Sequence, residues 1–359
     1  MKKGRCGLVG FYGHGNFGDE LFRILFANAF KDWDFYTFMD HCGSVGPPKD
    51  GSLVKEFVDC CDIIVIGGGD LIRPGATNHQ YFLDEFLRRP CFIHSVGVAK
   101  WTGFNKGYAK KLKEFLSHSN IRHISVRDQT SLAWIEGQLG SKAAVPPVCH
   151  ADLAFSGVYP DSKESSTDIG VILRKQQSQK DLSAMHALIN KCDREKLSCK
   201  FIVLSTEPMK SAESFVFDHF GETSEVEVPT SIKEMCSTLA SCNHIISSKY
   251  HGCLIGAIYG KKVLSLLKDT KFRNFFTELG CPSYMQSLDD LQKNVSLFDG
   301  FLSEFSAALP SHYIMRMQRS ASLGLSQLGI AISQHSLGVG DVDIRPKLTD
   351  DLPYRLGGT

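Results

Sequence analysis

The residue types best suited to chemistry lie in the segment HIISSKYHGCLIGAIYG, residues 244–260. An apolar run, predicted as a strand to residue 250, leads into Lys249 and His251, and a short helix is predicted from 253. While the chain stays extended, Lys249 and His251 point to the same side, toward the positive end of that helix. The segment therefore predicts an anion site with His251 as general acid or base, because imidazole titrates near neutral pH. A structural histidine is the alternative.

Two further cations occupy comparable places. Arg174 ends a strand candidate at 168–174, and Lys271 follows another at 262–267. The carboxyl ends of parallel strands share one edge of a sheet, so side chains from several strands can meet there. The side chains predicted to converge on one small phosphorylated acid are Arg174, Lys249, His251 and Lys271.

A glycine-rich segment, GFYGHGNFGDE at residues 10–20, ends an apolar run and opens an amphipathic stretch. Its form, GxGxxG, also fits a dinucleotide site with Asp40 as the ribose ligand. Asp19 and Glu20 argue against that, because they place carboxylates where a pyrophosphate would lie. We assign Asn16 and Asp19 to an acceptor sugar; the alternative for Asp19 is a helix cap.

Two more segments place polar residues after apolar runs. IVIGGGDLIR (64–73) ends in glycines and Asp70, which fits either a ligand site or a tight structural turn. SVRDQTS holds Arg127, whose guanidinium could bind an anionic group. An ion pair with Asp128 that stabilises the next helix is the alternative. We assign Asp70 and Arg127 to the acceptor.

These residues must be positioned by alternating strands and helices. Short apolar runs rich in β-branched residues, apolar on both faces, alternate with stretches of helical period, which predicts two doubly wound α/β halves around parallel sheets, with a cleft between them. The predicted strands are 6–13, 34–40, 62–69, 91–98 and 123–128, then 168–174, 200–206, 225–229, 243–250 and 262–267. The predicted helices are 19–31, 51–60, 78–88, 105–118 and 129–139, then 178–195, 210–220, 231–241, 253–260, 270–279 and 285–309. The predicted boundaries are 1–155 for the first half, 156–168 for a linker, 169–310 for the second half, and 311–359 for a C-terminal helix and a tail that loses its period from about 325.

Composition excludes several classes of protein. The 359 residues carry a net charge of +1, which gives no global attraction to nucleic acid or to an anionic membrane. We see no secretory signal and no apolar run long enough for a membrane span, so we expect a cytoplasmic protein. The twelve cysteines lie within apolar runs without a CxxC pair, and the thirteen histidines lack metal-site spacing. We therefore expect buried free thiols and no metal.

Five segments in order resemble the polysaccharide pyruvyltransferase family. GFYGHGNFGDE is similar to the family's glycine-rich start, GGGDLIR to its GGGxL element and SVRDQTS to its RDxxS segment. SSKYHGCLIGA resembles the hallmark SxRLHxxxxA, with Lys249 in place of arginine and Tyr250 in place of leucine. KDTKFRNFFTELG is similar to YDPKVxxFxxxLG. Lysine keeps the charge of the arginine but lacks its bidentate fork.

The resemblance implies a fold, a donor and a reaction. It implies two Rossmann-like halves in the glycosyltransferase-B arrangement, with phosphoenolpyruvate as co-substrate held mainly by the second half. His251 corresponds to the family's catalytic histidine, and Arg174 and Lys249 to residues that hold the donor's carboxylate and phosphate. Pyruvate would pass to a sugar hydroxyl of an exopolysaccharide or cell-wall precursor, as a ketal or an enolpyruvyl ether, without a cofactor.

The acceptor side and the rival functions stay open. A lipid-linked acceptor would bring a peripheral contact with the inner face of the membrane, and the sequence leaves the oligomeric state undefined. The alternatives are a nucleotide-sugar glycosyltransferase, a non-catalytic glycan-binding protein and, last, a dinucleotide oxidoreductase.

Overall fold

A computed structural model of the chain describes residues 4–38, 51–77, 80–161, 166–174, 179–207, 209–213, 215–287, 290, 296–302, 310–335 and 347–348. Contacts divide the chain into two compact units. Unit 1 comprises residues 1–14, 18–158 and 317–359, and unit 2 comprises residues 15–17 and 159–316. Asp40, considered above as a ribose ligand, lies outside the described residues.

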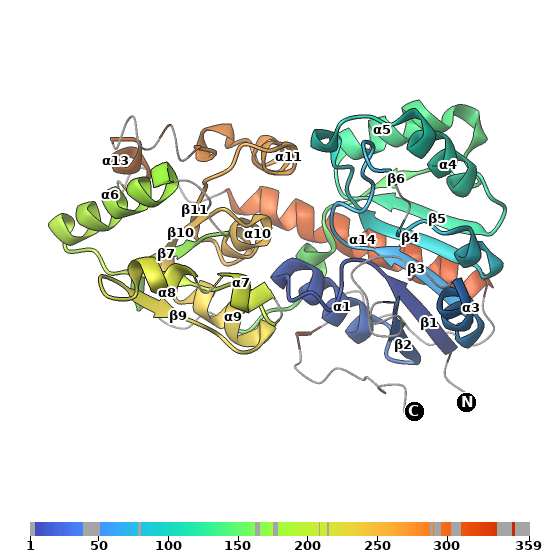
Figure 1. Ribbon diagram of the computed structural model, residues 1–359, viewed down its shortest axis with the longest axis horizontal. Coiled ribbons are helices and arrows are strands. Elements are labelled where there is room, and N and C mark those ends of the chain that lie inside the picture. The colour runs from blue at the N-terminus through green and yellow to red at the C-terminus, as the bar shows by residue number, and fades with distance from the viewer. Residues whose placement is uncertain are drawn as a thin grey trace. The chain divides into compact units, whose positions relative to one another are not determined.

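Unit 1 is built on a parallel six-stranded sheet in the order β2-β1-β3-β4-β5-β6 (Figure 1). The strands are β1 (Gly4–Val9), β2 (Trp33–Thr37), β3 (Ile63–Gly67), β4 (Cys91–Val96), β5 (Ile121–Val126) and β6 (Val148–Cys149). The helices are α1 (Phe17–Ala29), α3 (Gly51–Cys60), α4 (Lys106–Leu116) and α5 (Gln129–Leu139), the 3₁₀ helices η1 (Asp84–Arg88), η2 (Lys100–Thr102), η3 (Gly140–Lys142) and η4 (Leu153–Ser156), and the part of α14 (Ser311–His335) from residue 317.

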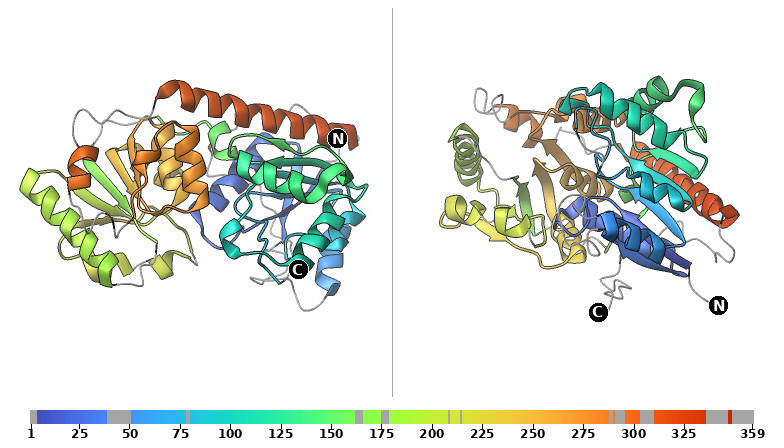
Figure 2. Two further views of the ribbon diagram at one scale, coloured as in Figure 1. Left: turned by 90° about the horizontal axis from the view of Figure 1, so that it is seen from above. Right: turned by 45° about the vertical axis from the view of Figure 1, so that its right-hand side comes forward.

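Helices cover both faces of this sheet, as the apolar strands predict. Helices α3, α4 and α5 share one buried core with β3, β4 and β5, centred on large side chains such as Phe57 and Phe115. On the other face α1 packs through Phe26 against Phe35 of β2. The long helix α14 also lies along that face, where the Oγ of Ser320 accepts a hydrogen bond from the N–H of Ala151 (Figure 2).

Three of the buried histidines of unit 1, His94, His123 and His150, lie close to one another. His94 on β4 and His123 on β5 lie with Nδ1 and Nε2 3.3 Å apart, and the Nδ1 of His150 lies 3.3 Å from the Oγ of Ser125. Burial, together with the neighbouring histidines, holds the pKa of His94 well below its ordinary value. Burial and, secondarily, His150 lower the pKa of His123 to about 4, and burial also lowers the pKa of His150. A Cβ on Gly324 of α14 would lie 2.8 Å from the ring of His150, so glycine lets the helix pack directly on this group.

We expect the free energy of unfolding to fall as the pH drops from about 6.5 to about 4, by about 1.4 kcal/mol per pH unit for each proton taken up on unfolding. The pKa values of these histidines are lowered in the folded protein, so the unfolded chain binds protons first in this window. Burying these histidines in the neutral form costs no stability at a pH above the pKa of histidine in the unfolded chain. As the pH falls below that value, the free energy of unfolding decreases. Urea unfolding at several pH values measures the slope. His123→Gln should flatten it and exposed His118→Gln should not, whereas a flat wild-type profile would contradict the expectation.

Unit 2 holds a parallel five-stranded sheet in the order β11-β10-β7-β8-β9, which is the Rossmann order when its strands are numbered from the first. The strands are β7 (Thr167–Ile172), β8 (Cys199–Ile202), β9 (Glu225–Glu227), β10 (Cys242–Ser247) and β11 (Lys262–Ser265). The helices are α6 (Gln179–Glu195), α7 (Met209–Glu213), α8 (Phe215–Phe220), α9 (Ile232–Ala240), α10 (Tyr250–Ile258), α11 (Thr270–Glu278), the 3₁₀ helix η5 (Pro282–Tyr284), α13 (Ser296–Leu302) and the start of α14.

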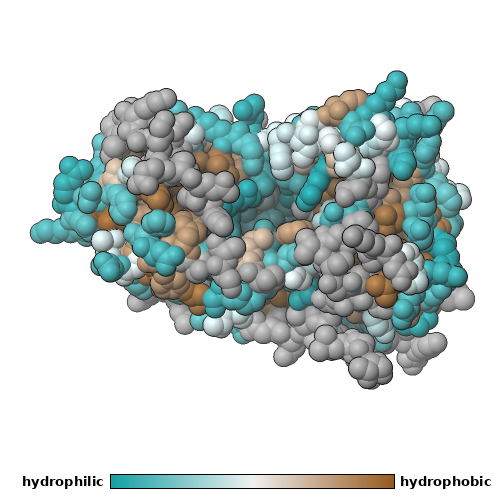
Figure 3. Space-filling view, viewed as in Figure 1, coloured by the Kyte–Doolittle hydropathy of each residue, from teal (hydrophilic) through white to brown (hydrophobic). Residues whose placement is uncertain are grey.

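Two helix layers also enclose this second sheet. Helices α6, α8 and α13 share a core with one face of it, and α9 and α10 pack against β10 and β11 (Figure 1). Among the residues coloured in Figure 3, hydrophilic ones are widespread and apolar ones lie in separate patches. The prediction of an α/β fold with two Rossmann-like halves is confirmed.

Several predicted elements were wrong in extent. The helix predicted at 78–88 is only the 3₁₀ helix η1, and β6 was not predicted. Helix α14 continues to His335, ten residues into the stretch predicted to lack a period. Strand β7 begins at Thr167, inside the predicted linker. Most important for the site, α10 begins at Tyr250 rather than at 253, so the strand before it is shorter than predicted.

Candidate active site

The strand order of unit 2 defines a crevice at the carboxyl ends of β7 and β10. The chain leaves β7 through α6 to pair β8 on one side, and later returns through α9 to pair β10 on the other side. Ligands of such sheets bind at the point where successive connections diverge in this way. Arg174 and Ser248 lie there, and the N–H of Arg174 donates a hydrogen bond of 2.7 Å to the Oγ of Ser248. The Arg174 side chain is exposed, as a ligand-binding cation requires.

The start of α10 gives Lys249 and His251 different surroundings. Lys249 is the N-cap residue, with an extended backbone, and His251 is the second residue of the helix. The prediction that the two side chains point to one side of an extended chain is wrong, because the helix begins between them. Lys249 is 6% exposed, whereas His251 is half-buried.

The ammonium group of Lys249 is held inside unit 2. Its Nζ lies 2.5 Å from the Oε2 of Glu213 and 2.6 Å from the carbonyl oxygen of Leu204. The hydroxyl of Ser205 donates a further hydrogen bond of 2.7 Å to the same Glu213 oxygen. In this structure the Lys249 ammonium therefore pairs with Glu213 and holds the start of α10 in place, and direct contact of Lys249 with the donor stays a prediction.

The start of α10 lacks the usual polar cap. Helices α4, α5, α9 and α11 are capped by the side chains of Asn105, Asp128, Ser231 and Asp269, whereas Lys249 makes no side-chain cap on α10. The backbone amides at this helix end and the positive end of the helix dipole favour an anion. The ring of Tyr250 packs edge-on against Phe272 and Phe275 of α11 and lies 5.1 Å from the ring of His251.

Lys271 lies near this edge but faces a carboxylate. It is the second residue of α11, and its Nζ is 3.8 Å from the Oδ2 of Asp269, the residue that caps α11. Backbone bonding between Leu266 and Ser247 keeps the carboxyl ends of β10 and β11 together, and β7 pairs on the other side of β10. The sheet therefore places Arg174, the start of α10 and the start of α11 along one edge.

The glycine-rich segment contributes to unit 2 as well. Asn16 forms an antiparallel bridge with Ser205, and the carbonyl of Gly15 accepts a hydrogen bond of 2.9 Å from the N–H of Thr206. A Cβ at residue 15 would lie 2.0 Å from the carbonyl oxygen of Thr206, so only glycine fits. Because Ser205 also bonds Glu213, contacts run from this segment to Lys249. Asn16, assigned to the acceptor half, groups with the opposite unit.

In unit 1 the successive connections diverge between β1 and β3. Both glycine clusters meet at this point, which is the topological switch point of the sheet. The hydroxyl of Tyr12 donates a hydrogen bond of 2.6 Å to the carbonyl oxygen of Gly67. The Oε1 of Glu20 accepts a hydrogen bond of 2.7 Å from the N–H of Gly13, which occupies a loop amide that a pyrophosphate would use. Asp19 lies beside the second cluster, since a Cβ on Gly69 would come within 2.8 Å of its Oδ1. Asp19 lies in the first turn of α1.

Arg127 forms a buried ion cluster. Its side chain is 3% exposed, with its guanidinium 2.5 Å from Asp70 and 3.3 Å from Asp152. The alternative pairing with Asp128 is wrong, because Asp128 caps α5 by accepting a hydrogen bond from the N–H of Ser131. Two carboxylates offset the charge of Arg127, so its place in the structure fits a positioning role for Asp70 more closely than direct contact with an anionic ligand.

Sequence reasoning missed Glu213 and Asp152, which determine the surroundings of Lys249 and Arg127. Neither lies in a segment with a recognisable pattern, and both act across many residues of sequence. Among the described residues, no three or more His, Cys, Asp or Glu side chains group as metal ligands, and no helix there has the length and apolar content to cross a bilayer.

Solved structures with a similar fold include three UDP-N-acetylglucosamine 2-epimerases. A putative one from Listeria monocytogenes has a TM-score of 0.55 at 11% identity, covering 93% of this chain and 97% of its own. One from Neisseria meningitidis, bound to UDP-GlcNAc, has a TM-score of 0.57 at 9% sequence identity, and the alignment covers 91% of this chain and 99% of that one. One from Methanocaldococcus jannaschii has a TM-score of 0.55 at 9% sequence identity, and the alignment again covers 91% of this chain and 99% of that one. At these identities the likeness shows the fold alone.

No curated protein matches the chain in sequence. The family described as Polysaccharide pyruvyl transferase matches residues 16–268, which include the end of the glycine-rich segment (residues 16–20), Arg174 and the start of α10. This match extends over more than half of the 359 residues and ends just after β11, the last strand of the unit 2 sheet in the chain. The chain therefore belongs to the polysaccharide pyruvyl transferase family.

Proposed function

We propose that this enzyme takes pyruvate from phosphoenolpyruvate, bound at the carboxyl edge of the unit 2 sheet, and transfers it to a sugar hydroxyl. The observation that carries the donor site is the start of α10, where the N-cap is a lysine without a side-chain cap and His251 follows in the first turn. Its neighbour along the sheet edge is the exposed Arg174. A small phosphorylated carboxylate matches a helix N-terminus with cations around it.

In the proposed reaction His251 protonates the methylene carbon of the enol, or assists the departure of phosphate. A first sugar hydroxyl then forms a bond to the second carbon. A second hydroxyl attacks the same carbon, the bond to the phosphate oxygen breaks, and a cyclic pyruvate ketal remains. Of the two hydroxyl protons, one balances the proton placed on the new methyl group and the other leaves with phosphate. Elimination after the first addition would instead leave an enolpyruvyl ether.

The residues divide into binding and positioning roles. We propose that Arg174 and Lys271 hold the donor's anionic groups and that the helix start stabilises developing charge on phosphate. Lys249 supports the site through its pair with Glu213. No metal or cofactor is required by this scheme.

The acceptor is proposed to be a glycan or a lipid-linked oligosaccharide of polysaccharide biosynthesis. If the acceptor is lipid-linked, we propose that the enzyme makes a peripheral contact with the inner, cytoplasmic face of the membrane. Trp101 and Phe104, 69% and 63% exposed, lie in a lysine-rich stretch of unit 1 and are the side chains best suited to it. Absence of co-sedimentation with anionic lipid vesicles would remove this part of the proposal.

Titration calorimetry with phosphoenolpyruvate tests the donor site. We expect wild-type protein to bind, and Arg174→Ala to weaken binding by roughly 10- to 100-fold, since a hydrogen bond to a charged group contributes about 1.5–3 kcal/mol. Arg194→Ala is the matched control, because this exposed arginine lies in the last turn of α6. UDP-GlcNAc, the ligand of the Neisseria structure, serves as competitor. Binding of UDP-GlcNAc without phosphoenolpyruvate would favour a nucleotide-sugar glycosyltransferase.

A further inference from the structure

A buried phenol in unit 1 has no hydrogen-bond acceptor for its O–H among the described residues. Tyr81 is 5% exposed, and the Gln80 side chain acts on its hydroxyl oxygen as a donor, but no acceptor in the described part of the chain lies within hydrogen-bond geometry of the hydroxyl. Burial raises the pKa of this phenol, so the group stays a neutral O–H donor. Buried tyrosine hydroxyls ordinarily find a partner in the protein or in ordered water. A buried O–H group without an acceptor therefore indicates a position for an oxygen atom of a ligand.

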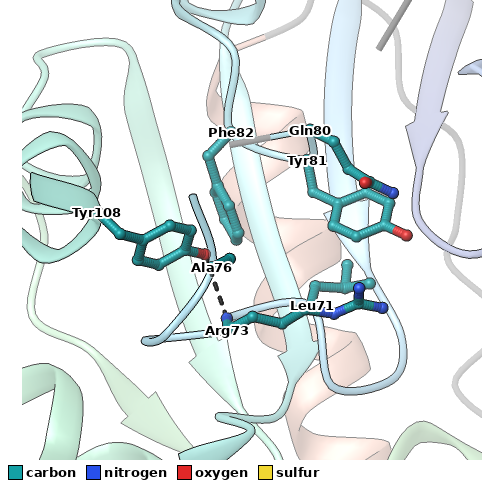
Figure 4. Close-up of a pocket in the computed structure, with 7 residues that line it drawn as sticks. All are labelled: Leu71, Arg73, Ala76, Gln80, Tyr81, Phe82 and Tyr108. Atoms are coloured by element: carbon teal, nitrogen blue, oxygen red, sulfur yellow. Dashed lines mark hydrogen bonds between the residues drawn. The ribbon is translucent and has the colours of Figure 1, made fainter. Parts of the chain in front are cut away.

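The phenol borders a small pocket with mixed polar and aromatic walls (Figure 4). The hydroxyl of Tyr81, the amide of Gln80 and the guanidinium of Arg73 extend toward the same side, as Figure 4 shows. The Arg73 guanidinium lies 5.9 Å from the centre of the Tyr81 ring. It is exposed and makes no ion pair with any carboxylate in the described part of the chain. The rings of Phe82 and Tyr108 complete the aromatic wall.

Tertiary contacts hold the pocket rigidly beside the switch point of unit 1. The hydroxyl of Tyr108 accepts a hydrogen bond of 3.2 Å from the N–H of Arg73. Ile72 bridges to Val98, which ties the segment after β3 to the segment after β4. Asp19 is close enough for its charge to act on the Tyr81 phenol, and it also adjoins Gly69. The pocket therefore adjoins the residues already assigned to the acceptor.

We propose that Tyr81, Gln80 and Arg73 form a subsite for one hydroxyl group of a neutral pyranose of the acceptor glycan, with the Tyr81 hydroxyl donating to that sugar oxygen. Sugar rings present hydroxyls at their edges and apolar C–H groups on their faces, and a wall of aromatic rings with a few fixed donors fits both. Asp19 is placed to accept from a neighbouring sugar hydroxyl. This inference rests on the proposed function for its ligand class and extends it by naming Gln80 and Tyr81, which lie outside the family-like segments, together with Arg73 at the end of GGGDLIR.

The test separates a ligand site from a structural tyrosine. Tyr81→Phe removes only the orphaned hydroxyl, so the melting temperature is expected to stay unchanged or rise, because an unsatisfied buried group is lost. Saturation-transfer NMR with methyl β-galactoside, methyl β-glucoside and an N-acetylmannosamine glycoside measures sugar binding without any transfer step. We expect a wild-type signal with at least one glycoside, and a Kd that rises at least 5-fold in Tyr81→Phe and in Gln80→Leu.

A matched substitution and an independent donor measurement make the result decisive. Tyr259→Phe removes a hydroxyl that is bonded at 2.9 Å to the carbonyl of Pro160, so it should lower the melting temperature and leave sugar binding unchanged. Equal sugar binding by wild type and Tyr81→Phe, or no wild-type binding to any glycoside, would overturn the subsite. Failure of phosphoenolpyruvate to bind in calorimetry would instead reject the donor assignment, so the two failures are distinguishable.

Discussion

His251→Ala is expected to lower kcat for acceptor-dependent phosphate release by roughly 10³-fold, within the 10²–10⁴ range typical of a positioned general acid or base. The affinity for phosphoenolpyruvate should change by less than about 3-fold, because the helix start and Arg174 hold the donor in this scheme. The substitution should also be tolerated by the fold. His251 is half-buried in the first turn of α10, and its ring packs edge-on against that of Tyr250.

Steady-state kinetics and calorimetry on the same preparation measure both quantities. His186→Ala is the matched control, because this histidine is exposed on α6 and packs against Phe220 away from the sheet edge. It should retain wild-type turnover. Near-normal turnover in His251→Ala, or a loss of turnover that tracks a lowered melting temperature, would contradict a catalytic role.

Lys249→Met is expected to lower the free energy of unfolding by about 3–5 kcal/mol, the usual cost of removing one partner from a buried ion pair. Glu213 is 5% exposed and lies 2.5 Å from the Lys249 ammonium, so the substitution would strand a buried carboxylate. Turnover should fall as well, since the pair positions the start of α10. The double variant Lys249→Met with Glu213→Leu should recover much of the stability, because well-packed apolar groups often replace such pairs without cost.

A double-mutant cycle by urea unfolding, with hydrogen exchange to assign the change to unit 2, gives the coupling between the two residues. Lys268→Met is the comparison, since its pair with Asp290 is 2.7 Å long but 45% and 39% exposed, and exposed pairs stabilise little. Additive effects of the Lys249 and Glu213 substitutions would contradict the proposed pair.

The sequence was sufficient to predict the sheets, because buried parallel strands are distinct apolar runs. Within the described residues, ten of the eleven strands coincide with predicted runs, and the missed one, β6, has only two residues and carries no pattern. The start of α10 was misplaced because Gly252 was read as a boundary. In the structure it lies inside the helix, where a Cβ would come within 2.5 Å of the Ser247 hydroxyl. Its requirement for glycine comes from packing, not from a turn.

The candidate site was predictable in its residue types and not in its pairings. The family-like segment SSKYHGCLIGA locates His251, and the predicted strand 168–174 locates Arg174, at one sheet edge. The partners of the buried ion pairs could not be predicted from the sequence. Asp70 lies 57 residues from Arg127 and Glu213 lies 36 residues from Lys249, so only the tertiary fold brings them together. The lack of an acceptor for the Tyr81 hydroxyl among the described residues has no signature in the sequence, because only the tertiary fold determines which groups lie near it.

The most direct test of pyruvyl transfer uses phosphoenolpyruvate carrying carbon-13 at its methylene carbon, incubated with the wild-type enzyme and a panel of glycoside acceptors. The proposed function predicts that the label appears on an acceptor glycan, with a methyl signal for a ketal or a methylene signal for an enolpyruvyl ether, and that His251→Ala abolishes it. Absence of label from every acceptor, with phosphoenolpyruvate recovered intact, would contradict the proposed donor and reaction.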